Sequence, residues 1–464
     1  MAIRIYNSLS KQVEDFKPMK PDMVLMYLCG PTVYDYVTIG NYRTYTLGDI
    51  VNRVFAFNGF KVKYIMNYTD VGHLTGDNAG DADVGDDRLE AAAEKEGRSA
   101  REIADYYIND FLKGYDKLNL IRPFKFTRAT EYIHEQLDLV RALERQGFTY
   151  RTSDGIYFDT SKFEEYGALS GLSAESIKEG ARVEPNPEKK NPTDFALWKF
   201  SPTDTKRWQE WDSPWGIGFP GWHLECSAMA MKELGETIDI HLGGEDLRMI
   251  HHQNEIAQSE CATGKKFVNY WMHGAFLQVD GGRMGKSLGN AFTVVDIENK
   301  GYDAMALRYF YLSAHYRSTL NFTWEALLGA QNSLHKLYDI LAGYKESEDA
   351  SPSERHLSLF IQAVNNDFNI PEALAVLWDT LKSNLPEPVK IATAIKMDAV
   401  LGLNLENYVG YEIPQDVVNL AKTRGEYRKA GIWDKADMVR RQIEEKGYIV
   451  EDASDGKFKL KRKM

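Results

Sequence analysis

Short apolar segments that alternate with amphipathic segments constrain the fold of this chain more than any other feature. Four strand-like segments, at residues 23–28, 61–68, 237–242 and 270–279, are rich in Val, Ile, Met, Leu and Tyr, and helix-like segments lie between them. This alternation is typical of a parallel sheet covered by helices. We therefore expect an α/β fold whose core is a Rossmann-type parallel sheet.

Two changes of pattern divide the chain further. Residues 126–200 carry short strand and turn signals, which indicate a connective segment inserted between two halves of the sheet domain, at residues 1–125 and 201–315. Helical periodicity then predicts an antiparallel helical bundle over residues 316–408. A charged helical pair and a short strand predict a small C-terminal domain over residues 409–464.

Charge and cysteine content exclude several classes of protein. The chain has 464 residues, with 56 basic and 68 acidic side chains and a net charge of −12, so any nucleic acid must meet a local basic patch. Three cysteines lie far apart, which argues against a disulfide framework. The N-terminus lacks the features of a secretory signal, and no apolar run approaches the roughly 18 residues of a membrane span. We expect a cytoplasmic protein that does not enter a membrane.

A candidate metal site begins with the stretch HHQNE at residues 251–255. His251 and Glu255 are four residues apart on one helix face, where both reach a single ion. His252 is also available, although its spacing of three from Glu255 is a looser match. Cys29, at the end of a predicted strand, and Cys226 would complete a donor set that suits zinc. Taken singly, each of these residues is more often part of a core than a ligand.

Two glycine-containing loops are candidate phosphate sites. The loop from Gly30 to Asn41 leads into a predicted helix, whose free N–H groups and dipole favour an anion. Far downstream, DGGRMGKSLGN at residues 280–290 places Lys286 and Ser287 at the tip of a loop hinged by glycine. A lysine there would neutralise charge on a leaving pyrophosphate. The alternative for each loop is an ordinary surface turn.

These loops and several longer motifs carry a family resemblance. In order along the chain, the motifs are CGPTVYD, PGWHLECSAM, HLGGEDL, HHQNEIAQSECA, NYWMHGAFLQVDGGRMGKSLGN and NDFNIPEAL. Together they resemble the cysteinyl-tRNA synthetase family within the class I aminoacyl-tRNA synthetases, from near residue 20 to the C-terminus. The resemblance implies that L-cysteine is activated by ATP, with magnesium, and transferred to the 3′ end of tRNA(Cys). It also implies a monomer with one zinc ion per chain, which binds the cysteine thiolate.

The resemblance implies roles for particular residues in binding zinc, the amino acid and ATP. It assigns the zinc to Cys29, Cys226, His251 and Glu255. Three further positions line the amino-acid pocket in the family, namely Thr69, Trp222 and Asp246, with Asp246 placed to hold the substrate ammonium. The positions that would contact ATP are Gly30, Thr32, Gly40, Arg283, Met284, Lys286 and Ser287.

Both signature loops depart from the family pattern. Thr38 and Asn41 stand in place of the two histidines of the HIGH signature, and RMGKS replaces KMSKS, so that Arg283 and Gly285 stand for a lysine and a serine. Thr and Asn still donate hydrogen bonds, and Arg keeps its charge. We expect an active enzyme, with Thr38, Asn41 and Lys286 as its catalytic residues.

The sequence leaves two alternative functions open. One is a ligase that joins cysteine to a sugar amine, although the C-terminal third resembles the anticodon-binding end of a synthetase. The other is a catalytically impaired paralogue that binds tRNA or acts as a regulatory protein. Basic residues near the C-terminus would supply the tRNA patch: Arg424, Arg428, Arg440, Arg441, Lys457, Lys459, Lys461, Arg462 and Lys463. For Trp433, we favour packing between helices over stacking on an anticodon base.

Overall fold

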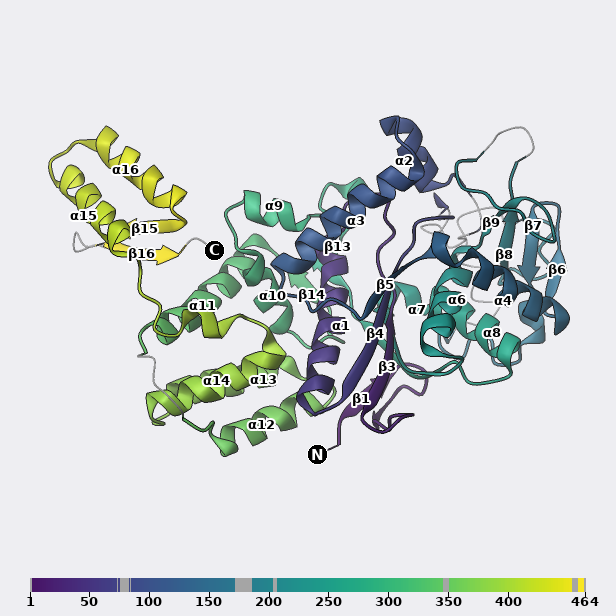
Figure 1. Ribbon diagram of the computed structural model, residues 1–464, viewed down its shortest axis with the longest axis horizontal. Helices are drawn as coiled ribbons and strands as arrows, with labels where there is room; N and C mark the ends of the chain where they lie inside the picture. The colour runs from purple at the N-terminus through teal and green to yellow at the C-terminus, as the bar shows by residue number, and fades with distance from the viewer. Residues whose placement is uncertain are drawn as a thin grey trace.

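The computed structural model describes residues 2–72, 74–75, 83, 85–171, 186–202, 207–344, 350–452 and 458–462. Its central sheet has five parallel strands in the order β11-β10-β3-β4-β5. They are β11 (Val268–Gly274), β10 (Ile238–Gly244), β3 (Met23–Leu28), β4 (Lys61–Tyr68) and β5 (Lys125–Arg128). The expected Rossmann-type parallel sheet is thus confirmed (Figure 1).

Helices cover both faces of this sheet. Helix α1 (Ile39–Phe57) packs on one face, against β3, β4 and β10, and α6 (Trp222–Leu234) packs on the other, against β3 and β4. Alternate residues of β3 therefore enter different cores: Met26 and Leu28 lie in the core with α1, whereas Leu25 and Tyr27 lie in the core with α6. A strand that is buried on both faces consists of consecutive apolar residues. The sequence therefore predicted β3.

The segment predicted as one strand at residues 270–279 is two strands in different sheets. β11 ends at Gly274, and β12 (Leu277–Val279) belongs to a three-stranded sheet with β13 (Gly282–Arg283) and β14 (Leu320–Phe322). The edge strand β11 pairs with β10, which ends at Gly244 opposite Gly274 because a helix begins at Glu245, so the ladder ends there. Beyond it, the guanidinium of Arg43 on α1 donates to the carbonyls of Ala275 at 2.8 Å and Phe276 at 2.5 Å, which satisfies these groups outside a sheet.

A second sheet lies beside the first and is antiparallel. It contains β6 (Thr149–Arg151), β7 (Gly155–Phe158), β8 (Phe195–Phe200) and β9 (Gly218–Pro220), and α4 (Ile133–Arg145) packs between it and α6. Strand β9 lies beyond residue 200, so this sheet draws on residues past the expected end of the inserted segment. The division of the chain into five domains stays a prediction.

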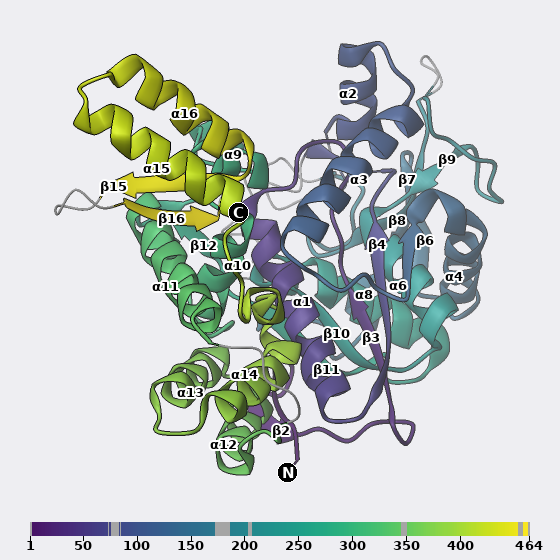
Figure 2. The ribbon, with the colours of Figure 1, turned by 60° about the vertical axis from the view of Figure 1, so that its left-hand side comes forward.

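The helical bundle consists of α11 (Trp324–Ala342), α12 (Glu354–Asn365), α13 (Ile370–Lys382) and α14 (Glu387–Leu401). Figure 2 shows α14 beside α1, and a buried ion cluster joins the two regions. Arg308, on α10 (Ala304–Leu312), donates to the carboxylate of Asp49 at 2.6 Å and to the carbonyl of Leu401 at 2.8 Å. Arg53 pairs with the same carboxylate at 2.8 Å.

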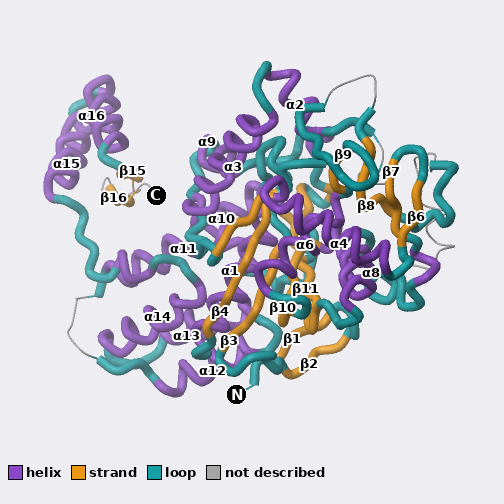
Figure 3. Tube along the Cα trace, turned by 45° about the vertical axis from the view of Figure 1, so that its right-hand side comes forward, coloured by secondary structure: helices purple, strands orange, loops and turns teal. Residues whose placement is uncertain are grey.

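The C-terminal part is a small module with its own core. Helices α15 (Gln415–Lys429) and α16 (Trp433–Glu445) pack on a hairpin of β15 (Tyr448–Asp452) and β16 (Phe458–Arg462). The module stands apart from the rest of the chain in two views (Figures 1 and 3). The remaining elements are β1 (Arg4–Asn7), β2 (Gln12–Asp15), α2 (Arg88–Glu96), α3 (Ala100–Lys117), α7 (Glu245–Arg248), α8 (His251–Thr263) and α9 (Val294–Asn299).

None of the helices among the described residues is both long and apolar enough to cross a membrane.

Candidate active site and metal centre

Two adjoining cavities open at the carboxyl edge of the central sheet. The strand order reverses between β3 and β10, and the loops that follow these two strands line both cavities. Ligands of open parallel sheets bind at this kind of position. One cavity has a volume of about 300 Å³ and includes Cys29 and Trp222 in its wall, and the other has a volume of about 970 Å³. Asn41, Asp246 and Lys286 line both.

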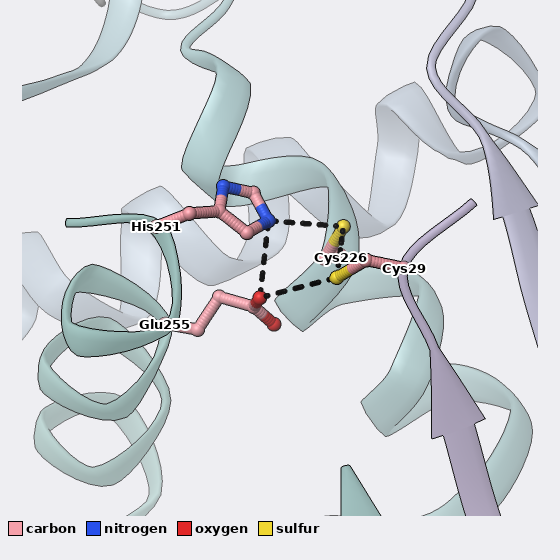
Figure 4. Close-up of side chains that lie close together, drawn as sticks. All are labelled: Cys29, Cys226, His251 and Glu255. Carbon is pink, nitrogen blue, oxygen red and sulfur yellow. Dashed lines mark hydrogen bonds and ion pairs between the residues drawn. The ribbon is translucent and has the colours of Figure 1, made fainter. Parts of the chain in front are cut away.

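Four buried side chains from three separate segments meet (Figure 4), and one of them, Cys29, lines the smaller cavity. Cys29 directly follows β3, Cys226 lies on α6, and His251 and Glu255 lie one turn apart at the start of α8. The two sulfur atoms are 3.7 Å apart, and Nε2 of His251 is 3.4 Å from the Cys226 sulfur. Oε1 of Glu255 is 3.1 Å from His251 Nε2 and 3.8 Å from the Cys29 sulfur.

These distances fit a tetrahedral zinc site. Zinc bonds of roughly 2.0–2.3 Å at tetrahedral angles separate neighbouring donor atoms by roughly 3.3–3.8 Å, close to the spacing of these four groups. A second set of donors also converges here: Cys29, His241, His252 and Glu255. The set with His251 contains both thiols and fits the zinc preference for sulfur better.

The electrostatics of the cluster separate donors that are ready to bind a cation from donors that must lose a proton. Burial raises the pKa of Cys29, and the sulfur of Cys226 beside it raises it further. Burial alone would also raise the pKa of Cys226, but hydrogen bonds from Cys29 and His251 lower it to about 6. Burial opposes the charge of His251, yet the Cys226 and Glu255 anions raise its pKa to about 10. Despite burial, His241 and His251 lower the pKa of Glu255 to about 2.

Sequence reasoning missed a shell of histidines behind the four donors. Nε2 of His241 lies 3.0 Å from Oε2 of Glu255, and Nδ1 of His223 lies 3.0 Å from Nδ1 of His251. Partners of this kind orient metal ligands. His252 and His273 continue the shell through a contact of 2.8 Å. The available signal was the crowding of five of the ten histidines into residues 223–273.

The residues predicted for the amino-acid pocket take different positions. Trp222 begins α6, and its ring lies 4.5 Å from that of His251 at a tilt of 31°. Asp246 lies on α7 and lines the cavity. Thr69 is buried behind the wall, where its backbone pairs with that of Thr32. Gly30 lies against the next strand, since a β-carbon there would be 1.7 Å from the carbonyl oxygen of Asn67.

The two residues that replace the HIGH histidines form the N-terminal cap of α1. Thr38 is the N-cap residue, and its hydroxyl accepts from the N–H of Asn41, while the side chain of Asn41 accepts from the Thr38 N–H. This reciprocal pair is a capping box. Thr38, Gly40 and Asn41 all line the larger cavity.

The RMGKS loop is docked over this helix start. Arg283, Met284, Lys286 and Ser287 line the larger cavity, and the Met284 sulfur would lie 3.3 Å from a β-carbon on Gly40. Lys286 forms an ion pair of 2.6 Å with Asp35, a residue that sequence reasoning did not single out. No local spacing signals this contact, because the two residues are far apart in the chain.

The predicted C-terminal basic patch needs correction. Arg424 is 2% exposed and pairs with Asp452 at 2.7 Å, so it holds the module together and is unavailable to RNA. Arg428 pairs with the same carboxylate at 3.0 Å. Lys457 and Lys463 lie outside the described residues. The packing predicted for Trp433 is wrong, because its side chain is 58% exposed, with the Arg428 guanidinium 5.4 Å from the ring centre.

Comparison with known proteins identifies the family of this chain. A family model described as the catalytic domain of class I (C) tRNA synthetases matches residues 15–332. Cysteine–tRNA ligase 1 of Burkholderia lata is 45% identical over 98% of this chain and 96% of its own length. Cysteine–tRNA ligase of Treponema denticola is 38% identical over 97% of this chain and 98% of its own length.

Solved structures resemble the fold more distantly. Methionyl-tRNA synthetase of Mycobacterium tuberculosis, in complex with methionyl-adenylate, has a TM-score of 0.55 and 14% identity, over 82% of this chain and 90% of that one. At this identity the likeness concerns the fold alone.

Proposed function

Because this chain belongs to the cysteine–tRNA ligase family of class I aminoacyl-tRNA synthetases, we propose how its residues activate L-cysteine and charge tRNA(Cys). The proposal rests on one observation above all. Two thiols, an imidazole and a carboxylate converge around Cys29, which lines a cavity of about 300 Å³ together with the RMGKS lysine.

The donor set around Cys29 provides the selection of the amino acid. Cys29, Cys226, His251 and Glu255 would hold zinc, which when bound supplies a soft acceptor for a substrate thiolate that a serine hydroxyl cannot match. Asp246, in the wall of the same cavity, presents a carboxylate for the substrate ammonium. The cluster and this carboxylate would thus bind two ends of one small amino acid.

The loop that starts α1 provides hydrogen bonds for ATP. The capping box uses Oδ1 of Asn41, and within the described residues its Nδ2 donates no hydrogen bond, so that this group is available to a phosphate oxygen. The helix N-terminus adds its dipole and its free N–H groups. Lys286 reaches both cavities and would exchange Asp35 for the triphosphate, which enters with magnesium.

The proposed reaction has two steps. The carboxylate of cysteine attacks the α-phosphate of ATP, and pyrophosphate leaves with the electrons of the broken P–O bond. A hydroxyl of the terminal tRNA ribose then attacks the carbonyl of the adenylate, and AMP leaves. Positioning and neutralisation of charge by Asn41 and Lys286 carry most of the acceleration, because neither step needs a covalent enzyme intermediate.

The alternative of a cysteine:sugar-amine ligase is disfavoured by the C-terminal region. Relatives named as cysteine–tRNA ligases match at least 97% of the chain, which includes the helical bundle and the module of α15 to β16. The zinc identity, the monomeric state and the cytoplasmic location stay predictions.

The test is cysteine-dependent exchange of labelled pyrophosphate into ATP by zinc-loaded protein, with serine as the control amino acid. Exchange with cysteine and not with serine supports the proposal. Loss of exchange in protein that still holds zinc and binds tRNA(Cys) would overturn it, and would favour a paralogue that binds tRNA without activating the amino acid.

A further inference from the structure

Three tyrosines form a cluster beside the smaller cavity. Tyr36 lies in the loop between β3 and α1 and lines this cavity, whereas Tyr106 and Tyr107 lie on α3. The hydroxyls of Tyr36 and Tyr106 hydrogen-bond each other at 2.8 Å. Both side chains remain accessible, with 39% of Tyr36 and 42% of Tyr106 exposed. The cluster therefore presents aromatic surface to solvent directly beside the proposed site of aminoacylation.

Neighbouring side chains fix the positions of the two exposed tyrosine rings. Tyr107 is buried, and its ring meets those of Tyr36 and Tyr106 edge-on at centroid distances of 5.1 Å each. The guanidinium of Arg98 lies 5.3 Å from the Tyr106 ring centre and pairs with Glu96 at 3.6 Å. Glu96 also accepts from the Tyr107 hydroxyl at 3.4 Å. The exposed rings are thus fixed in place, which lowers the entropic cost of stacking a ligand on them.

The chemistry proposed for the two cavities does not use this cluster. Tyr106 lines neither cavity, and Tyr36 lines only the smaller one. Exposed tyrosine rings next to a guanidinium are a combination that binds single-stranded nucleic acid, because the rings stack on bases and the cation meets phosphate. The terminal ribose of tRNA must reach the aminoacyl adenylate, so the unpaired end of the RNA has to enter the cavities beside which this cluster lies.

We propose that Tyr36 and Tyr106 form a stacking platform for the single-stranded 3′ end of tRNA, and that Arg98 contacts its phosphates. This inference rests on the proposed function, since it names the surface that guides one substrate into the site. The platform acts on the binding and positioning of RNA and leaves the formation of the adenylate unchanged.

The test compares two reactions in the zinc-loaded full-length chain. For Tyr106→Ala, kcat/KM for charging tRNA(Cys) falls by at least about fivefold, as expected for the loss of one base-stacking ring. Cysteine-dependent pyrophosphate exchange, measured without tRNA, stays within about twofold of the parent protein. Tyr106→Phe keeps the ring and restores charging. Phe124→Ala removes a 73% exposed aromatic side chain that lines neither cavity, and serves as the matched control with unchanged charging.

A binding measurement locates the contact on the RNA. The affinity difference between parent and Tyr106→Ala is present for intact tRNA(Cys) and absent for tRNA trimmed of its unpaired 3′ nucleotides. Equal charging by the Ala variant and the parent would overturn the platform, as would a difference that persists with trimmed tRNA or an equal loss of exchange and charging. If the parent protein shows no exchange, the proposed function fails, and the comparison of intact with trimmed tRNA still tests the platform.

Discussion

Thr38 and Asn41 hydrogen-bond each other across the first turn of α1, with the Thr38 hydroxyl donating to Oδ1 of Asn41 at 2.8 Å. The two residues that replace the signature histidines are therefore a coupled pair that starts the helix. Because Oδ1 of Asn41 accepts hydrogen bonds from Thr38, its Nδ2 remains available to ATP.

Substitutions at Asn41 and Thr38 distinguish the binding of ATP from the capping of α1. Asn41→Ala removes the donor to phosphate, and the rate of cysteine-dependent exchange falls by about 10²-fold, as for the loss of one donor to developing charge. Thr38→Val removes the cap and the hydroxyl that holds Oδ1 of Asn41. It lowers the free energy of unfolding by about 1 kcal/mol and slows exchange less than Asn41→Ala does. Exchange kinetics and thermal unfolding of both variants check this. An Asn41→Ala variant with parental exchange would rule out a role for this side chain in adenylation.

The ion pair between Lys286 and Asp35 predicts competition with ATP. The two side chains are 48% and 38% exposed, so the pair contributes only about 0.2–1 kcal/mol, and ATP must displace it to engage the lysine. Asp35→Asn therefore lowers KM for ATP by up to about fivefold, and in a Lys286→Ala background the same substitution has no effect. Steady-state exchange kinetics of the two single variants and the double variant measure this. A rise in KM for Asp35→Asn would contradict the competition.

Proton release on zinc binding follows from the pKa values at the donor cluster. Near pH 7.5, Cys226 with a pKa of about 6 and Glu255 with a pKa of about 2 are already anions. Cys29, whose pKa is raised, and His251, with a pKa of about 10, still carry protons that zinc must displace. Zinc uptake therefore releases two protons, one from Cys29 and one from His251, and the affinity rises with pH. Calorimetry in buffers of different ionisation enthalpy counts them, and uptake without proton release would contradict the assignment.

The buried cluster around Arg308 predicts a large loss of stability. Arg308 is fully buried, and Arg53 still pairs with Asp49 in Arg308→Leu. The variant leaves the buried carbonyls of Leu401 and Leu118 without this donor, which costs about 1–3 kcal/mol for each unsatisfied group. Arg122→Leu breaks an ion pair with Asp116 that is more than half exposed, and changes stability by less than about 1 kcal/mol. Thermal unfolding of the two variants compares them. Similar melting temperatures would show that the cluster does not hold α1 and α14 together.

Features that depend on local pattern could be predicted from the sequence. Strand β3 is a run of apolar residues because both faces are buried, and the turn spacing of His251 and Glu255 already suggested a shared ion. The choice between His251 and His252 could not be made from spacing alone, because both imidazoles lie within reach of Glu255.

Features set by distant partners could not be predicted. The carbonyls of Ala275 and Phe276, just past the end of β11, accept hydrogen bonds from Arg43 on a distant helix. Arg424 is buried because Asp452 comes from a later strand, and Lys286 finds Asp35 only once the two loops are folded together. Arg43, Arg424 and Lys286 each contact a residue that is distant in the sequence. No short sequence spacing predicts such a contact.

We propose that cysteine is selected through a bond between its thiolate and a zinc ion held by Cys29 and Cys226. X-ray absorption at the zinc edge, on zinc-loaded protein with cysteine or with serine, measures this bond directly. We expect the number of sulfur neighbours of zinc to rise from two to three when cysteine is added and to stay at two with serine. Two sulfur neighbours under both conditions would contradict it.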